Sequence, residues 1–167
     1  AGEHDGGDTN ETGNPFSIPV ISNVTYVGSG ATATGVGGDG NDRTFAIRDN
    51  AGGKYYNSIF TDFAGVGVNI EDLGSGEDSR SRLENGDLVF GNNMWFGYGA
   101  GNTAEAILPQ EFVRTAFVAS ANTVEDPSLR GISRTDDAGL DPRLALGSPA
   151  TSNADFSYAA ELYQKLG

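Results

Sequence analysis

Acidic side chains that lie beside a basic residue in Gly-rich turns are the groups in this chain best suited to chemistry. Two such groups occur: Asp39 and Asp42 with Arg43, and Asp49 and Asp72 with Arg48. Carboxylate oxygens at loop spacing are ligands that Ca²⁺ prefers, so these four aspartates are the candidate metal ligands. Neither GGDGND nor GSGEDS matches a calcium-binding loop. We therefore expect Asp49 and Asp72 to accept backbone N–H bonds in turns, with Ca²⁺ as the alternative and no other cofactor.

Catalysis by a histidine base is not expected in this chain. His4 is the one histidine, it lies in an acidic segment, and there is no cysteine. A Ser-His-Asp relay and a multi-histidine zinc site therefore lack their parts. A two-carboxylate glycosidase stays open because 23 acidic residues offer many pairs, although no pair stands out. We predict that the protein is not an enzyme and has no catalytic residues.

Length and charge limit the partners of the chain. Its 167 residues fit one domain, the net charge is −13, and the first 42 residues contain no Lys or Arg. Such a surface repels phosphate backbones, so nucleic acid is not an expected partner. No apolar run approaches the ~18 residues of a membrane span, and we expect no membrane insertion. The N-terminus lacks a basic, apolar signal region, so export would need a signal that was removed or lies upstream.

Amino-acid composition and hydrophobic patterning divide the chain into three regions. Residues 1–14 form an acidic, Gly-rich arm that is ordered only if something holds it. Residues 15–101 alternate strand-length apolar segments with turns rich in Gly, Asn and Asp. Residues 102–167 form a C-terminal cap and tail, in which we predict an amphipathic helix starting near Pro109, with a strand over 114–119 as the alternative. A short closing helix is expected over 157–166.

An internal repeat organises the middle region. An Asn precedes an aromatic residue by three positions three times, with the asparagines 34 and 35 residues apart. The pairs are Asn23 with Tyr26, Asn57 with Phe60, and Asn92 with Trp95. Units of this size that lack a helical pattern bury their apolar faces by stacking on one another. We therefore expect an amide ladder of the three asparagines at one corner and a stack of the three aromatic rings inside.

A second repeated phrase places Ala46-Ile47-Arg48-Asp49 against Asn69-Ile70-Glu71-Asp72. If these phrases stack, Arg48 and Glu71 occupy equivalent positions, and we expect them to form a surface ion pair worth ~0.2 to 1 kcal/mol. A β-sandwich also has short alternating strands. The strands of a sandwich, however, have no structural reason to repeat an Asn three residues before an aromatic residue. The sandwich is therefore the alternative fold.

The segments Asn122–Pro127, Gly139–Arg143 and Gly147–Ala150 resemble the tail that closes pectin-lyase-like β-helix proteins. The stretch from Phe45 to Leu88 is similar to the last coils of large secreted bacterial proteins of that family. The resemblance implies an all-β right-handed parallel β-helix with a short C-terminal helical cap, of which this chain is the C-terminal portion. It also implies an extracellular or cell-surface location, and polysaccharide lyase activity as the enzymatic alternative.

The expected function is that of a non-catalytic structural or adhesive surface protein. A stack of strands with an open end pairs with other chains, so we expect self-association into a homo-oligomer, fibre or filament. The alternative is a carbohydrate-binding or polysaccharide-cleaving protein, with an extracellular polysaccharide as partner. That alternative requires Tyr55, Tyr98 or Trp95 to point outward as a sugar-stacking surface.

Overall fold

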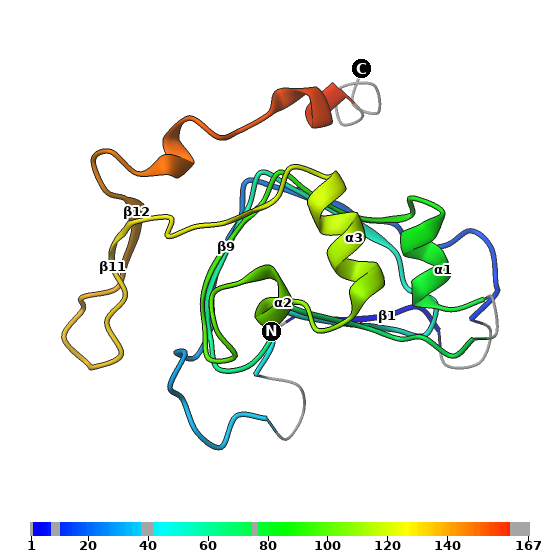
Figure 1. The fold of residues 1–167 in the computed structure, drawn as a ribbon, viewed down its shortest axis with the longest axis horizontal. Helices are drawn as coiled ribbons and strands as arrows, with labels where there is room; N and C mark the ends of the chain where they lie inside the picture. Colours follow the sequence, from blue (N-terminus) through cyan, green and yellow to red (C-terminus); the bar gives the residue numbers. More distant parts are fainter. Residues whose placement is uncertain (1, 8–10, 38–41, 75–76, 161–167) are drawn as a thin grey trace.

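A computed structural model describes residues 2–7, 11–37, 42–74 and 77–160. Its strands and helices are short and follow one another closely along the chain (Figure 1). The strands are β1 (Gly2–Asp5), β2 (Val20–Ser22), β3 (Thr25–Val27), β4 (Phe45–Arg48), β5 (Gly53–Tyr56), β6 (Ile59–Phe63), β7 (Val68–Ile70), β8 (Leu88–Gly91), β9 (Met94–Tyr98), β10 (Thr123–Val124), β11 (Leu129–Gly131) and β12 (Asp141–Leu144). The helices are α1 (Ser79–Glu84), α2 (Ala104–Ile107), α3 (Glu111–Ala119) and the 3-10 turns η1 (Pro149–Thr151) and η2 (Phe156–Ala159).

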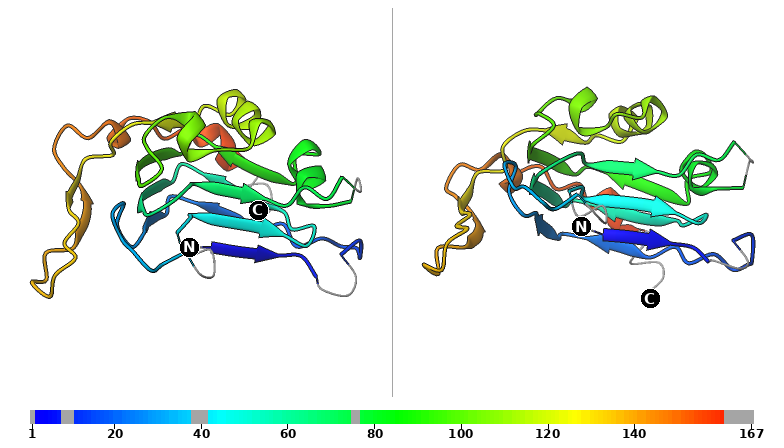
Figure 2. Two further views of the ribbon diagram at one scale, coloured as in Figure 1. Left: turned by 60° about the horizontal axis from the view of Figure 1, so that its bottom comes forward. Right: turned by 90° about the horizontal axis from the view of Figure 1, so that it is seen from below.

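Three of the sheets contain only parallel strands. Their orders are β1-β4-β7, β2-β5-β8 and β3-β6-β9-β10. Between most of these partners the chain passes through the other two sheets, whereas β9 and β10 are joined through α2 and α3. Figure 2 shows the result as layers, with β1 at one end of the molecule and α2 and α3 at the other.

The prediction of an all-β right-handed parallel β-helix is wrong. In the described part of the chain the strands are divided among four small sheets, β11 and β12 pair antiparallel, and helices α1, α2 and α3 belong to the body. The structure therefore mixes helices and strands and is not a single all-β solenoid. The β-sandwich alternative is also wrong, because the three main sheets are parallel and sandwich sheets are antiparallel.

Helix α1 explains part of this error. The segment around Asp78 is rich in Gly, Ser and charged residues, a composition typical of the turns predicted within residues 15–101. Asp78 instead acts as an N-cap, with its side chain accepting a bond from the backbone N–H of Ser81 at 2.9 Å. Burial of the Asp78 carboxylate opposes its ionisation, yet these hydrogen bonds hold its pKa below the ordinary value.

The helix predicted near Pro109 is present as α3, which starts two residues later, and the alternative strand over 114–119 is absent from this described segment. Val113 and Phe117 form its buried face. The closing helix predicted over 157–166 is represented by η2, and the remainder from residue 161 lies outside the described residues.

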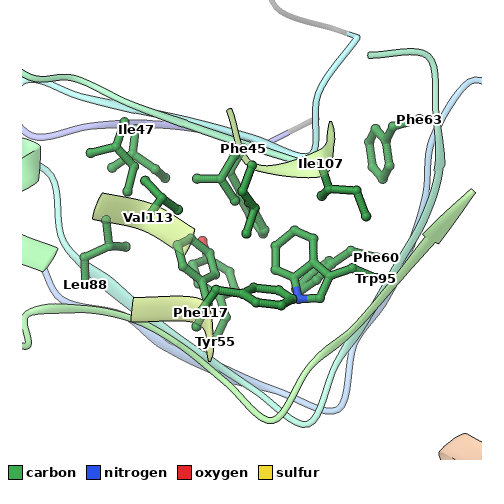
Figure 3. Close-up of a cluster of buried hydrophobic side chains, with 14 of the residues drawn as sticks. Phe45, Ile47, Tyr55, Phe60, Phe63, Leu88, Trp95, Ile107, Val113 and Phe117 are labelled. Atoms are coloured by element: carbon green, nitrogen blue, oxygen red, sulfur yellow. The ribbon is translucent and has the colours of Figure 1, made fainter. Parts of the chain in front are cut away.

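Aromatic rings from all three parallel sheets meet in one core (Figure 3). Phe45 on β4, Phe60 on β6 and Trp95 on β9 are each 0 % exposed. The ring centroids of Phe60 and Trp95 are 4.5 Å apart, and those of Phe45 and Phe60 are 5.1 Å apart. Ring pairs of this kind add stabilisation beyond the area that they bury, so this cluster is the main cohesive contact between sheets.

The end of the stack beyond β7 is closed by side chains and helices. The Gln110 side chain accepts a hydrogen bond from Ile70 N at 2.8 Å and donates one to Ile70 O at 2.6 Å. An amide group thus occupies the place that a further strand would take. Gly67 N donates to Ile107 O at 2.7 Å beside it. The backbone groups of Ile70 and the N–H of Gly67 are therefore satisfied at this edge, and α3 covers the core.

No helix in the described part of the chain has the length and apolar character needed to cross a membrane.

Replacing Phe45 by Ala is expected to lower the free energy of unfolding by about 3 to 5 kcal/mol. The reason is that Phe45 contacts rings on both of the other parallel sheets, namely Tyr55 and Phe90 on one and Phe60 on the other. Urea denaturation followed by tryptophan fluorescence measures the loss. Val118→Ala is the control, since Val118 is 72 % exposed on α3 and its loss should stay within about 0.5 kcal/mol. Equal losses in the two variants would contradict this account of the core.

Candidate functional site

Asparagines occupy the sharp turns that precede three strands, and these turns are called corners below. Asn23, Asn57 and Asn92 have φ values of 58°, 51° and 53°, and they precede β3, β6 and β9. Asn tolerates this left-handed conformation better than other residues with a side chain. The regular spacing of the three asparagines in the sequence therefore follows from the positive φ that the backbone adopts at each corner.

The predicted amide ladder joins two of the three asparagines. Asn92 Nδ2 donates to Asn57 Oδ1 at 2.7 Å, whereas the amide of Asn23 donates to Ser22 Oγ at 3.4 Å. The amides at Asn57 and Asn92 also hold the tail, because Asp155 N donates to Asn57 Oδ1 at 3.0 Å and Asn92 Nδ2 donates to Asn153 O at 2.5 Å. The amides of Asn57 and Asn92 thus bind the chain's own C-terminal segment.

The three predicted aromatic residues lie one above another. Tyr26 is in register with Phe60, and Phe60 with Trp95. The ring centroids are 5.5 Å apart for the first pair and 4.5 Å for the second. Phe60 and Trp95 are fully buried, while Tyr26 is only partly buried. The structure places all three on the core side of their sheet.

A second polar row, which the sequence reasoning missed, lies one residue further along. Ser58 and Asn93 are 1 % and 0 % exposed. Asn93 Oδ1 accepts from Ser58 N at 2.9 Å and Asn93 Nδ2 donates to Tyr55 O at 3.0 Å. Asn122 continues the row, because its Oδ1 accepts from Asn93 N at 3.0 Å. This row satisfies buried backbone groups between layers. The Asn-Asn pair at 92 and 93 was its only sequence signal.

A cavity of about 480 Å³ lies between the outer side of β3, β6 and β9 and the tail. Asparagine amides and Arg143 supply its polar lining, and Ile59 and Met94 are among its apolar lining. Arg143 is held by Asp141 at 2.7 Å, and this guanidinium lowers the pKa of Asp141 to about 2. The cavity offers hydrogen-bond donors and acceptors, and no aromatic side chain lines it among the described residues.

The calcium candidates from the sequence are scattered. Asp39 lies outside the described residues, Asp42 pairs with Arg43 at 3.0 Å, and Asp72 pairs with Arg80 at 2.9 Å. Asp49 alone joins other acids, namely Glu11 and Glu71.

The ion pair expected between Arg48 and Glu71 is replaced by another. Arg48 instead contacts Asp5 at 2.7 Å and Glu3 at 2.5 Å. Both acids belong to β1, which pairs with β4 on the side opposite β7. Glu71 uses its carboxylate to accept a bond from Asp49 N at 2.9 Å.

The end of the stack at β1, β2 and β3 differs from the closed end. These strands are terminal in their sheets within the described structure. The expected arm over 1–14 contributes β1 to this edge. Its His4 ring packs against Phe45 and Tyr55, and the Tyr55 hydroxyl bonds to His4 Nε2. Burial lowers the pKa of His4 and raises that of Tyr55, so both stay neutral near pH 7.

Asn93→Ala should lower the free energy of unfolding by at least about 2 kcal/mol. The substitution leaves the buried Ser58 N and Tyr55 O without their partners. Chemical denaturation measures the change. Asn69→Ala is the matched control, because Asn69 is exposed in β7. If the two variants lose the same stability, the buried row does not have the role assigned to it.

Acid should weaken the attachment of β1. The pKa of His4 is lowered from its ordinary value of 6.5 when the chain is folded. The stability that neutral His4 contributes is therefore present above about pH 6.5 and is lost as the pH falls below it. The difference in unfolding free energy between the wild type and His4→Gln, measured between about pH 5 and pH 8, is expected to shrink on acidification. A difference that is constant with pH would refute this role of His4.

Comparison of the chain with protein-family models, with curated proteins and with solved structures finds no match. The resemblance of residues 122–150 to the tails of pectin-lyase-like proteins thus gains no support and stays an expectation from the residues alone.

Proposed function

We propose that the protein is a non-catalytic assembly domain that pairs with a second copy of itself through the edge formed by β1, β2 and β3. The observation that carries the proposal is the contrast between the two ends of the stack. Terminal strands occur at both ends, but at one end Gln110 bonds to Ile70 of β7 and α3 packs against β8. At the other end, β1, β2 and β3 are terminal in their sheets in the described structure.

The backbone direction of these strands leaves groups facing outward from the edge. Gly2 N donates to Thr44 O and Gly6 N donates to Arg48 O, both toward β4. Gly28 N likewise donates from the end of β3 to Thr61 O at 2.8 Å. Backbone groups alternate in direction along a strand, so those of the intervening residues point away from the neighbouring strand. Such groups are a template for pairing with another chain.

The layer formed by β1, β2 and β3, called the first layer below, has apolar side chains that are incompletely covered. Ile21 and Tyr26 remain partly exposed, although they pack against the core. Their register partners one layer further in, Tyr55 and Phe60, are 0 % exposed. Covering Ile21 and Tyr26 with the same surface of another molecule removes apolar area from water, which favours association.

The geometry favours a dimer. A surface that meets its own copy through a twofold axis closes the assembly at two molecules, whereas a filament needs two different complementary surfaces. At the opposite end Gln110 already occupies the backbone groups of Ile70 in β7, so that end is a poor second surface. We accordingly propose a closed dimer in place of the fibre or filament expected from the sequence.

Polysaccharide binding is less well supported than assembly. Tyr55, Trp95 and Tyr98, the aromatic residues on which that alternative depended, are 0 %, 0 % and 3 % exposed. They are part of the core and offer no stacking surface to a sugar.

Sedimentation velocity is expected to show a monomer–dimer equilibrium that shifts toward dimer between about 0.05 and 0.5 M NaCl. The direction follows from Glu3 and Asp5 on the pairing strand, because salt screens the repulsion between two acidic edges. Thr25→Pro should weaken the dimer at least about tenfold, since Thr25 lies in β3 at an outward-facing backbone position and proline lacks the N–H.

Thr25→Val is the control, because it keeps the backbone N–H and should dimerise like the wild type. Circular dichroism of both variants checks that they are folded. A folded wild type that stays monomeric over the whole range of protein and salt concentration would refute the proposed function.

A further inference from the structure

Three carboxylates meet where one sheet ends. Glu11, Asp49 and Glu71 each offer an oxygen atom, and these atoms all lie within 4.8 Å of one another. Glu11 follows β1 in the chain, Asp49 directly follows β4, and Glu71 directly follows β7. Since β1, β4 and β7 are neighbours in one parallel sheet, their carboxyl ends lie at the same edge. Sheet pairing therefore brings together acids that are far apart in the sequence.

The backbone holds two of these acids in place. Asp49 has a φ of 55°, and its N–H donates to Glu71 Oε2 at 2.9 Å. Glu71 is anchored in turn by its own N–H, which donates to Ile47 O at 2.8 Å. The second carboxylate oxygen of Glu71 and both oxygens of Asp49 accept none of these bonds, so ligand atoms remain in the cluster.

An independent observation comes from the residue beside Asp49. Asn50 is 1 % exposed, and its Nδ2 donates to the backbone carbonyl of Glu11 at 2.7 Å, so its amide is bonded to a residue that carries one of the three carboxylates. The other end of the same amide, Asn50 Oδ1, is buried without a hydrogen-bond partner. A buried acceptor that nothing binds destabilises the folded chain. A cation in the cluster would give this oxygen a partner.

Among the described residues, the ion pair that reaches this cluster comes from Arg48, which is shared with other acids. Arg48 Nε lies 3.8 Å from Asp49 Oδ2, but the same guanidinium forms shorter contacts with Glu3 and Asp5. Carboxylates at this spacing repel one another unless a cation or a proton intervenes.

We propose that Glu11, Asp49, Glu71 and the Asn50 amide oxygen bind a divalent cation, and that the ion is Ca²⁺. The donor set consists of oxygens alone, and it mixes carboxylates with a neutral amide oxygen. Such a set suits a hard cation, with water completing the six to eight ligands that Ca²⁺ takes. Zn²⁺ is disfavoured because the set has no nitrogen or sulfur ligand.

Binding at this place ties together three layers of the sheet. Glu11 belongs to the segment after the edge strand β1, while the other ligands belong to the segments after β4 and β7. A bound ion therefore stabilises the first layer against detachment from the second. The ligands lie at the end of one sheet and include none of the strand residues used in the proposed dimer, so the two proposals stand or fall separately.

Calorimetric titration of the full chain with CaCl₂ in metal-free buffer tests the site. We expect saturable binding of one ion per chain and a rise in Tm in Ca²⁺ relative to EDTA. Asp49→Asn and Glu71→Gln should each weaken binding at least about tenfold. Both variants keep the local structure, because Asn suits the positive φ at position 49 and Gln still accepts the bond from Asp49 N.

Glu125→Gln is the matched control, as Glu125 is an exposed acid that follows β10 in a different sheet. It should bind Ca²⁺ like the wild type. The titrations are run in the Thr25→Pro background as well, so that loss of dimer and loss of the ion are read apart. Absence of saturable binding to the folded wild type, or equal weakening in Glu125→Gln, would overturn the proposal.

Discussion

Register between layers is the constraint on which this structure depends. Each corner asparagine adopts a left-handed backbone, and the strand after it therefore starts with the same phase as the strand in the neighbouring layer. That common phase directs Tyr26, Phe60 and Trp95 to one side of their sheet. A shift by one residue would exchange inward and outward side chains along the strand. The aromatic core and both polar rows would be lost together.

Polar bonding and apolar packing support each other at these corners. The buried amide of Asn93 satisfies backbone groups one layer away, and Asn122 does the same in the next layer. Rings of Phe60 and Trp95 pack beside this row. Because backbone groups buried without partners are costly, the row permits strands as short as three residues to be enclosed in a dry core.

Residue patterns predicted some of these features and missed others for physical reasons. The spacing of Asn23, Asn57 and Asn92 indicated which residues align, because one backbone conformation recurs with one residue type. The sequence did not reveal the buried polar row. Its members, Ser58, Asn93 and Asn122, occupy equivalent positions in neighbouring layers but are not all the same residue type. The fold class was wrong because α1 depends on a single capping aspartate, Asp78, within a segment of turn-like composition. Of the acidic cluster, the sequence indicated Asp49 alone, since Glu11 joins it only through the pairing of β1 with β4.

The Gln110 side chain makes the two ends of the molecule different in their capacity to accept a further layer of strands. By bonding to both backbone groups of Ile70, it ends the sheet with a single residue in place of a strand. A duplication that inserts another layer at that end would have to remake this contact and the packing of α3 at once. A layer added below β1 would meet only strand edges and partly covered side chains. A layer added on the β1 side would therefore disturb fewer contacts of the described structure than one added on the helical side.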